Sequence, residues 1–338
     1  MSSEMIVLAE KARAQTEGLN ETWWVWLATL GGLAVLLLLD LVIVDRKPHE
    51  VTIGEASKWV CFYIACALLF GLGVWYFGGH DVAIQYYTGY ITEYSLSVDN
   101  LFIFMVIMSS FAVPSIYQHR VLLIGILLAL VFRGIFIAVG AQLINRFVWV
   151  FFIFGAFLLW TAISMVRKKD EEEEYQENAV VRWVRKVYPV TEDYHGTKMT
   201  VRSEGRRWLT PMAVVIVAIG SADVMFAVDS IPAIFGITQD PFLVFVANAF
   251  ALMGLRQLYF LLGGLVDKLI YLSVGLAVIL GFIGIKLIIH ALHEYHVVPD
   301  WLEIGNLMSL GVILAVLAVT TVASLAKSKK DAQRAARS

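Results

Sequence analysis

Charged residues are scarce in this chain. Lys, Arg, Asp and Glu make up 16% of its 338 residues and 59% are hydrophobic, whereas a soluble domain carries about a quarter charged residues. This balance excludes an ordinary soluble protein and predicts an all-α membrane protein in contact with a lipid bilayer. The formal net charge is −2, and no basic stripe that could neutralise phosphates occurs outside one loop. We therefore expect no nucleic-acid partner.

Several chemical signatures are also missing. The two cysteines, Cys61 and Cys66, lie in one apolar segment, where small buried hydrophobic residues are the simplest interpretation. No phosphate-binding loop of the form G-x-x-x-x-G-K-[ST] occurs, so the chain is not expected to be driven by ATP on its own. The first 22 residues include four glutamates, the wrong polarity for the basic start of a cleavable signal. We expect a protein that is not an enzyme.

Long apolar runs are what the chain does contain. Because roughly twenty apolar residues cross the hydrocarbon of a bilayer, the runs predict nine spanning helices. These lie near 24–44, 58–77, 86–111, 120–144, 147–166, 211–232, 241–263, 267–290 and 305–326. With the amino terminus outside, 20 of the 26 Lys and Arg lie in cytoplasmic regions and three in outside regions. The carboxyl terminus is then cytoplasmic.

These runs divide the chain into five parts. We expect an extracytoplasmic tail at 1–23, a membrane half at 24–166, a charged cytoplasmic loop at 167–210, a second membrane half at 211–326 and a cytoplasmic tail at 327–338. The loop holds an acidic run and then residues 180–188, where apolar and basic residues recur at helical spacing. That stretch either lies along the inner membrane surface or belongs to a solvated linker, and the pattern favours neither.

One acidic pattern occurs twice inside the apolar runs. The copies are Glu93-Tyr-Ser-Leu-Ser-Val-Asp99-Asn100 and Asp223-Val-Met-Phe-Ala-Val-Asp229-Ser230. In both, a carboxylate is followed six residues later by Val-Asp and a small polar residue. An ionised carboxylate in hydrocarbon costs at least a few kcal/mol, so a site that keeps four of them is expected to use negative charge.

The two copies predict an inverted-topology repeat. They lie on the third and sixth predicted helices, which are three positions apart and therefore run in opposite directions through the membrane. Each acidic helix is followed by a helix with one arginine, Arg133 in the first half and Arg256 in the second. Inverted repeats with a binding site at their interface are common in secondary transporters.

The spacing within each copy predicts a break in its helix. A separation of six residues rotates a helix by about 120°, so Glu93 and Asp99 cannot share a face, whereas Glu93, Ser97 and Asn100 can. For Asp99 to join them we expect the helix to unwind near 98–100. In the second copy Pro232 removes a backbone donor and favours a broken helix. Freed carbonyls would then serve as ligands.

The residue types predict a hard divalent cation as the ligand. Carboxylate, amide, hydroxyl and carbonyl oxygens suit Mg²⁺, Ca²⁺ and Mn²⁺, whereas the thiolate and imidazole ligands of Cu⁺ and Zn²⁺ are missing from these helices. Buried carboxylates also take up protons when a metal leaves, which would couple transport to a proton gradient. The candidate metal-site residues are Glu93, Asp99, Asn100, Asp223, Asp229 and Ser230.

Other interpretations stay open at this point. The four acids could instead neutralise Arg133, Arg256 and Lys286 in buried pairs, which leaves one negative charge unexplained. Two buried aspartates also occur in intramembrane aspartyl proteases, although their G-x-G-D pattern is absent here. An assembly or metal-delivery factor for secreted proteins is a further alternative. Asn248 is an interhelical contact or a further ligand.

Three histidines form one more candidate. His290, His293 and His296 are spaced by three at the outer end of a predicted helix, and they either bind metal there or only form hydrogen bonds.

Both acidic copies resemble the motifs of a known family. The long segment from Asp223 to Phe242, continuing through Asn248 to 254–260, and the shorter one from Glu93 to Phe102 are similar to those of the TerC/Alx family of bacterial membrane proteins. The resemblance covers about residues 24–326. It implies a nine-helix inner-membrane protein in the wider superfamily of LysE-type exporters, associated with tellurium resistance by name and with manganese efflux by function.

The resemblance also implies a direction and a cargo. It points to export of Mn²⁺, with Glu93, Asp99, Asp223 and Asp229 as the metal-site candidates and Asn100 and Ser230 beside them. Neither the residues nor the resemblance decides the oligomeric state, and a homo-oligomer stays open.

Overall fold

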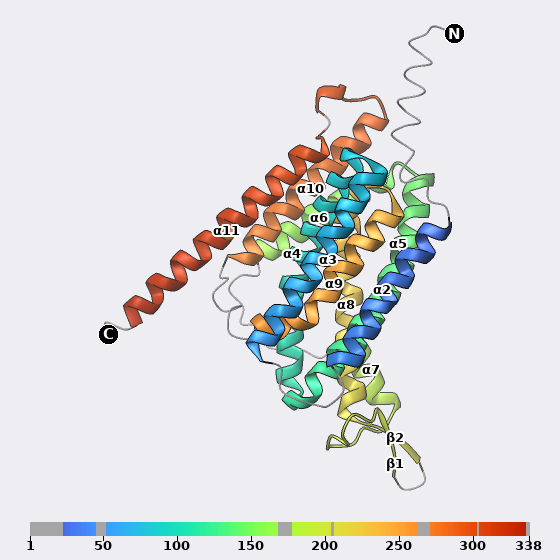
Figure 1. Ribbon diagram of the computed structural model, residues 1–338, viewed down its shortest axis with the longest axis vertical. Coiled ribbons are helices and arrows are strands. Elements are labelled where there is room, and N and C mark those ends of the chain that lie inside the picture. The colour runs from blue at the N-terminus through green and yellow to red at the C-terminus, as the bar shows by residue number, and fades with distance from the viewer. Residues whose placement is uncertain are drawn as a thin grey trace.

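The computed structural model describes residues 23–44, 52–167, 178–203, 206–262, 271–302 and 304–335, and shows a bundle of long helices (Figure 1). The long apolar helices of the bundle are α2 (Trp23–Val44), α3 (Ile53–Gly78), α4 (His80–Ser110), α5 (Ser115–Arg146), α6 (Val150–Arg167), α8 (Pro211–Phe235), α9 (Pro241–Leu262), α10 (Leu272–Glu294) and α11 (Asn306–Ala335). Of the predicted tails at 1–23 and 327–338, residues 1–22 and 336–338 lie outside the described residues.

Eight of these helices are long and apolar enough to cross a membrane. The remaining one, α2, counts as a shorter apolar helix over Trp23–Leu39. The prediction of a multi-pass, all-α membrane protein is therefore confirmed. The count of nine, which needs α2 as a spanning helix, stays a prediction, as do the orientation and the inverted repeat.

The centre of the bundle is formed by α4, α5, α8 and α9. Helix α4 packs against α8 and α9, and so does α5. Glycines allow close contact between α5 and α8, since a Cβ at Gly125 would lie 2.8 Å from a methyl carbon of Ile219. Helix α9 is buried along nearly its whole length, because α2 and α3 cover its other sides. The helices with the acidic copies and the two arginines thus form the core.

A second close contact joins the outer helices α6 and α10. A Cβ at Gly155 would lie 2.8 Å from the backbone oxygen of Gly284, and a Cβ at Gly284 would lie 2.9 Å from that of Gly155. The two backbones therefore touch without an intervening side chain, the kind of contact that small residues permit between membrane helices.

Helix α4 does not unwind at residues 98–100. It is helical from His80 to Ser110, and 91–110 contains no glycine or proline. Two hydroxyl groups near this stretch are satisfied within the helix: Thr88 donates to the carbonyl of Ile84 (2.6 Å), and Ser95 to that of Ile91 (2.6 Å). Since the helix accommodates its own polar side chains, the expected unwinding there was wrong.

Helix α8 also stays intact through Pro232. It ends three residues later at Phe235, and the N–H of Gly236 donates to the carbonyl of Pro232 (3.0 Å). The proline removes only its own N–H bond to the carbonyl four residues earlier, and the helix continues through it to its end. The predicted break in the second copy was therefore wrong as well.

The described part of the loop at 167–210 is folded. Helix α7 (Ala179–Val187) is capped by Asn178, whose side-chain oxygen accepts from the N–H of Val181 (2.9 Å). Strands β1 (Thr200–Ser203) and β2 (Arg206–Leu209) pair antiparallel as a hairpin. A plain linker is excluded for these residues, while the acidic run at 168–177 lies outside the description.

This segment is attached to the bundle at two places. The side chain of Asn178 donates to Ser221 Oγ of α8 (2.6 Å), and the hydroxyl of Tyr194 donates to the carbonyl of Phe111, just after α4 (2.9 Å). Helix α11 continues without a break to Ala335, so the described part of the predicted tail at 327–338 is helical.

Candidate functional site

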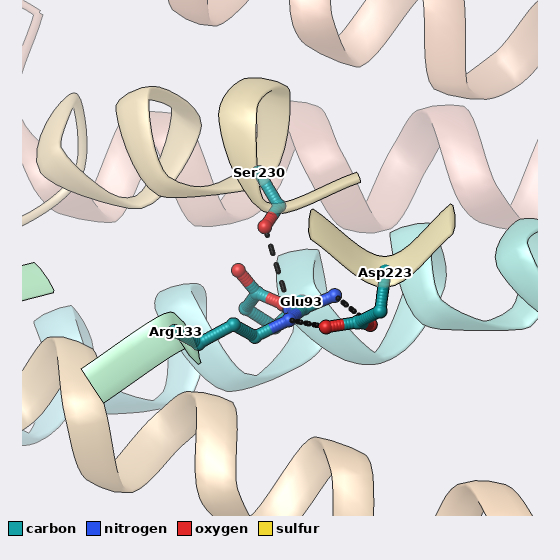
Figure 2. A network of polar contacts seen from close by, with 4 residues as sticks. All are labelled: Glu93, Arg133, Asp223 and Ser230. Atoms are coloured by element: carbon teal, nitrogen blue, oxygen red, sulfur yellow. Dashed lines mark hydrogen bonds and ion pairs between the residues drawn. The ribbon is translucent and has the colours of Figure 1, made fainter. Parts of the chain in front are cut away.

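The guanidinium of Arg133 lies between the two acidic copies (Figure 2). On one side Nη1 donates to Glu93 Oε2 (2.8 Å). On the other, Nε donates to Asp223 Oδ2 (3.3 Å) and Nη2 to Asp223 Oδ1 (3.1 Å). A longer contact joins Nη1 to Ser230 Oγ (3.4 Å). Helix α5 thus supplies a cation that links α4 to α8, and the first half of the chain to the second.

All four side chains are almost completely removed from solvent. Glu93 is 0% exposed, Arg133 and Ser230 are 1% exposed, and Asp223 is 2% exposed. Buried charges persist only when they are paired and hydrogen-bonded. Here one guanidinium faces two carboxylates, so full ionisation leaves a net charge of minus one. Such a site favours a proton or a further cation.

The cluster lies far from the helix ends. Asp223 is twelve residues from both Pro211 and Phe235, which places it about 18 Å from either end of α8. Arg133 is thirteen residues before Arg146, about 20 Å from the nearer end of α5. The hydrocarbon core of a bilayer is about 30 Å thick, so these distances place the charges deep within the span.

Two buried polar atoms on α4 lack a hydrogen-bond partner among the described residues. They are Glu93 Oε1 and the hydroxyl of Ser97, which lies one helical turn further on the same face. The amide nitrogen of Asn248 on α9 is in the same situation, so its role as contact or ligand is not decided. A buried carboxylate oxygen without a partner is a natural acceptor for a cation or a proton.

The predicted site residues are only partly gathered. Glu93, Asp223 and Ser230 meet at Arg133. Among the described residues no hydrogen bond or ion pair joins this cluster to Asn100 or Asp229, which are both partly buried, although Asp229 lies close enough for the charges of Arg133 and Glu93 to act on it. The side chain of Asp99 lies outside the described residues. Within the described part of the chain, no group of three or more His, Cys, Asp or Glu is placed to hold a metal ion. Arg133 fills the space between the acids instead.

Helix geometry explains which residues meet. Ser230 follows Asp223 by seven residues and returns to the same face, whereas Asp229 is rotated away by about 120°. On α4, helical spacing in the sequence predicts a shared face for Glu93 and Asn100. It does not predict the central position of Arg133, for which the sequence suggests only the role of a counter-ion. The signal that could have placed it was a lone arginine in the middle of an apolar helix.

The pairing alternative is therefore correct for Arg133. Arg133 neutralises Glu93 and Asp223 together, while Lys286 donates to Asn306 Oδ1 and Ser309 Oγ of α11 (both 3.1 Å). Arg256 is buried on α9 with 1% exposure. Pairing and a functional site thus coincide at Arg133.

The histidines do not form a metal centre with other His, Cys, Asp or Glu residues that the structure describes. The Nε2 of His290 lies 2.9 Å from the amide nitrogen of Gln239, and its ring meets the ring of Phe151 edge to face. At this position His290 is a polar contact between α10 and the turn before α9.

Fold and site together define the class of this protein. It is a polytopic helical membrane protein with a buried cluster of acids and an arginine between its two halves. The model of the integral membrane protein TerC family matches residues 78–332. The chain belongs to the TerC family.

Curated relatives span nearly the whole chain. An uncharacterized membrane protein of Mycobacterium tuberculosis (strain ATCC 25618 / H37Rv) is 44% identical over 323 residues, covering 92% of this chain and 81% of the relative. One from Myxococcus xanthus is 40% identical over 304 residues, covering 90% and 92%. A protein of Escherichia coli (strain K12), named as a membrane-bound redox modulator, Alx, is 39% identical over 298 residues, covering 86% and 90%. No solved structure matches the chain.

Proposed function

We propose that this protein is a secondary transporter that exports hard divalent cations, Mn²⁺ foremost, from the cytoplasm in exchange for protons. The observation that carries the proposal is the meeting of Glu93 and Asp223, one from each half, around a single positive charge. Structural pairing alone would need one carboxylate for one guanidinium. The second carboxylate supplies the excess negative charge that a cation pathway requires.

The available donors suit the cargo. Oxygens of Glu93, Asp223 and Ser230 lie together in the core. Asp229 is partly buried on α8, the helix that also carries Asp223 and Ser230. Oxygen ligands of this kind suit Mn²⁺ and Mg²⁺ rather than Cu⁺ or Zn²⁺. A carboxylate that gives up a metal inside an apolar bundle takes up a proton, which is the chemical basis for exchange. The direction, outward, is an expectation from the resemblance to manganese exporters.

Flux into proteoliposomes tests the proposal. Purified protein is reconstituted around a Mn²⁺-sensitive dye, a pH gradient is imposed, and uptake of external MnCl₂ is followed. We expect flux from the wild type that the gradient accelerates, and background flux from Asp229→Asn and Asp99→Asn. Asp193→Asn, which makes the same chemical change at an exposed residue of the 178–210 segment, is the control and should keep wild-type flux. Wild-type flux equal to that of empty vesicles contradicts the proposal.

The alternative of an assembly or metal-delivery factor has one observation in its favour. The 178–210 segment is folded and carries Arg182, Arg185 and Lys186 at exposed positions, which could bind an acidic partner. Replacing residues 179–209 by a short flexible linker separates the two functions. If the membrane helices carry out transport, Mn²⁺ flux should largely survive this replacement. If the segment serves assembly, the assembly function should be lost while the Mn²⁺ flux stays unchanged.

A further inference from the structure

The cation that the structure shows between the two acidic copies is part of the protein. Three nitrogens of Arg133 point at oxygens from three side chains, and both carboxylates that face it come from the candidate ligand set. A guanidinium fork matches carboxylate geometry closely, so this is a well-formed cation site with a tethered occupant.

A metal ion bound to the same oxygens would have to share them with the guanidinium. A divalent ion needs carboxylate oxygens at about 2.0–2.6 Å, and the oxygens that face each other are already bonded to Arg133. Placing both cations side by side in a buried cluster would add repulsion that little water is present to screen. Arg133 and the cargo are therefore competitors for one site.

We propose that Arg133 is a built-in substitute for the cargo: its guanidinium occupies the site when it is empty and must leave Glu93 before Mn²⁺ binds. The inference rests on the proposed function. The contact with Glu93 is the one to break, because it is a single hydrogen bond, whereas Asp223 holds the guanidinium by two. Glu93 Oε1, which has no partner in the described part of the chain, is the first oxygen available to the metal.

Such a substitute has a clear role in a transport cycle. After the metal leaves, two buried carboxylates without a counter-ion would repel each other and open the core. The guanidinium returns to them and lets the empty site stay closed. Arg133 is in this sense a residue that sets affinity and release, and it need not touch the cargo.

Binding of Mn²⁺ to purified protein in nanodiscs tests this, measured by titration calorimetry with MnCl₂. Arg133→Ala removes the competitor, so we expect binding about tenfold tighter or more than wild type, together with slower export. Lys286→Ala is the matched control, because it removes another buried cation, whose Nζ donates to Asn306 and Ser309 of α11. The affinity of this variant for Mn²⁺ should equal that of wild type. Arg133→Lys, which keeps the charge without the fork, should lie between wild type and Arg133→Ala.

Free guanidinium provides a sharper readout that a merely structural arginine would not show. Millimolar guanidinium chloride should weaken Mn²⁺ binding by Arg133→Ala and partly restore its export, while leaving wild type unchanged. Tetramethylammonium chloride at the same concentration should do neither, because it cannot donate hydrogen bonds to carboxylates.

The outcomes distinguish the two proposals. Wild type that neither binds nor moves Mn²⁺ overturns the proposed function and this inference with it. Wild type that transports, with a folded Arg133→Ala that binds Mn²⁺ no more tightly, overturns only the inference. If Arg133→Ala does not fold, a structure of wild type with Mn²⁺ decides: the distance from Arg133 Nη1 to Glu93 Oε2, now 2.8 Å, must exceed hydrogen-bond range, and an unchanged distance refutes the inference.

Discussion

The two acidic copies are nearly equivalent in sequence but not in structure. Asp223 on α8 accepts from two nitrogens of Arg133 with both of its oxygens. Glu93 on α4 accepts from one nitrogen with Oε2, and its Oε1 has no hydrogen-bond partner among the described residues. The second copy thus holds the arginine, while the first keeps an oxygen available for another ligand.

The difference comes from how one arginine is shared between two halves. Arg133 follows the first copy along the chain, yet its fork is directed at the second copy across the α5 and α8 interface. Any symmetry between the halves is therefore broken at the site by a single side chain. A carboxylate that is held at both oxygens stabilises the bundle, and one that is held at a single oxygen is the better candidate to respond to a ligand.

The largest effect is expected for Asp223→Asn. The amide keeps the shape but replaces the two charge-assisted hydrogen bonds of the fork by at most one to a neutral oxygen, which costs about 2–4 kcal/mol while Glu93 stays as the counter-ion of Arg133. We expect a strongly lowered midpoint of thermal unfolding in detergent and Mn²⁺ flux at background in proteoliposomes. A midpoint within experimental error of wild type would show that the fork does not hold α5 to α8.

A smaller loss of stability is expected for Glu93→Gln. Arg133 keeps its fork with Asp223, so the cost is that of one charged hydrogen bond, about 1–3 kcal/mol. Flux should still fall to background, since the open carboxylate oxygen is lost. Equal thermal midpoints for Glu93→Gln and Asp223→Asn would break the comparison between the two copies.

The pairing itself is measured by the double variant Asp223→Asn with Arg133→Gln. Each single variant loses the interaction between Arg133 and Asp223, and the double variant loses it only once, so its loss should be about 1–3 kcal/mol smaller than the sum of the single losses, with Glu93 left as the buried carboxylate. Export should not return, because the acid is still absent. Strict additivity of the two unfolding free energies would mean that the charges do not interact.

The smallest effect is expected for Ser230→Ala. Its contact with Arg133 Nη1 is long, 3.4 Å, and a hydrogen bond to a hydroxyl contributes about 1 kcal/mol or less at such a length. Stability should fall slightly, and the flux should stay well above that of either acid variant. A loss of flux as complete as that of Glu93→Gln would instead indicate that the hydroxyl is a ligand of the cargo.

The membrane helices could be predicted from sequence because the bilayer imposes their length. The shared face of Asp223 and Ser230 also follows from helical periodicity alone. The central position of Arg133 could not be predicted, since it depends on α5 packing against both α4 and α8. The helix breaks at 98–100 and at Pro232 were wrong because the pattern does not show that hydroxyls of α4 bond within their own helix, or that α8 ends so soon after its proline.

The contact between Gly155 and Gly284 bears on what can move. Helix α6 belongs to the first half of the sequence and α10 to the second, yet their backbones touch directly. Backbones in contact have no side chains between them, so the two sequence halves meet directly at this seam. Any movement of one half as a rigid body against the other has to slide or separate these two backbones.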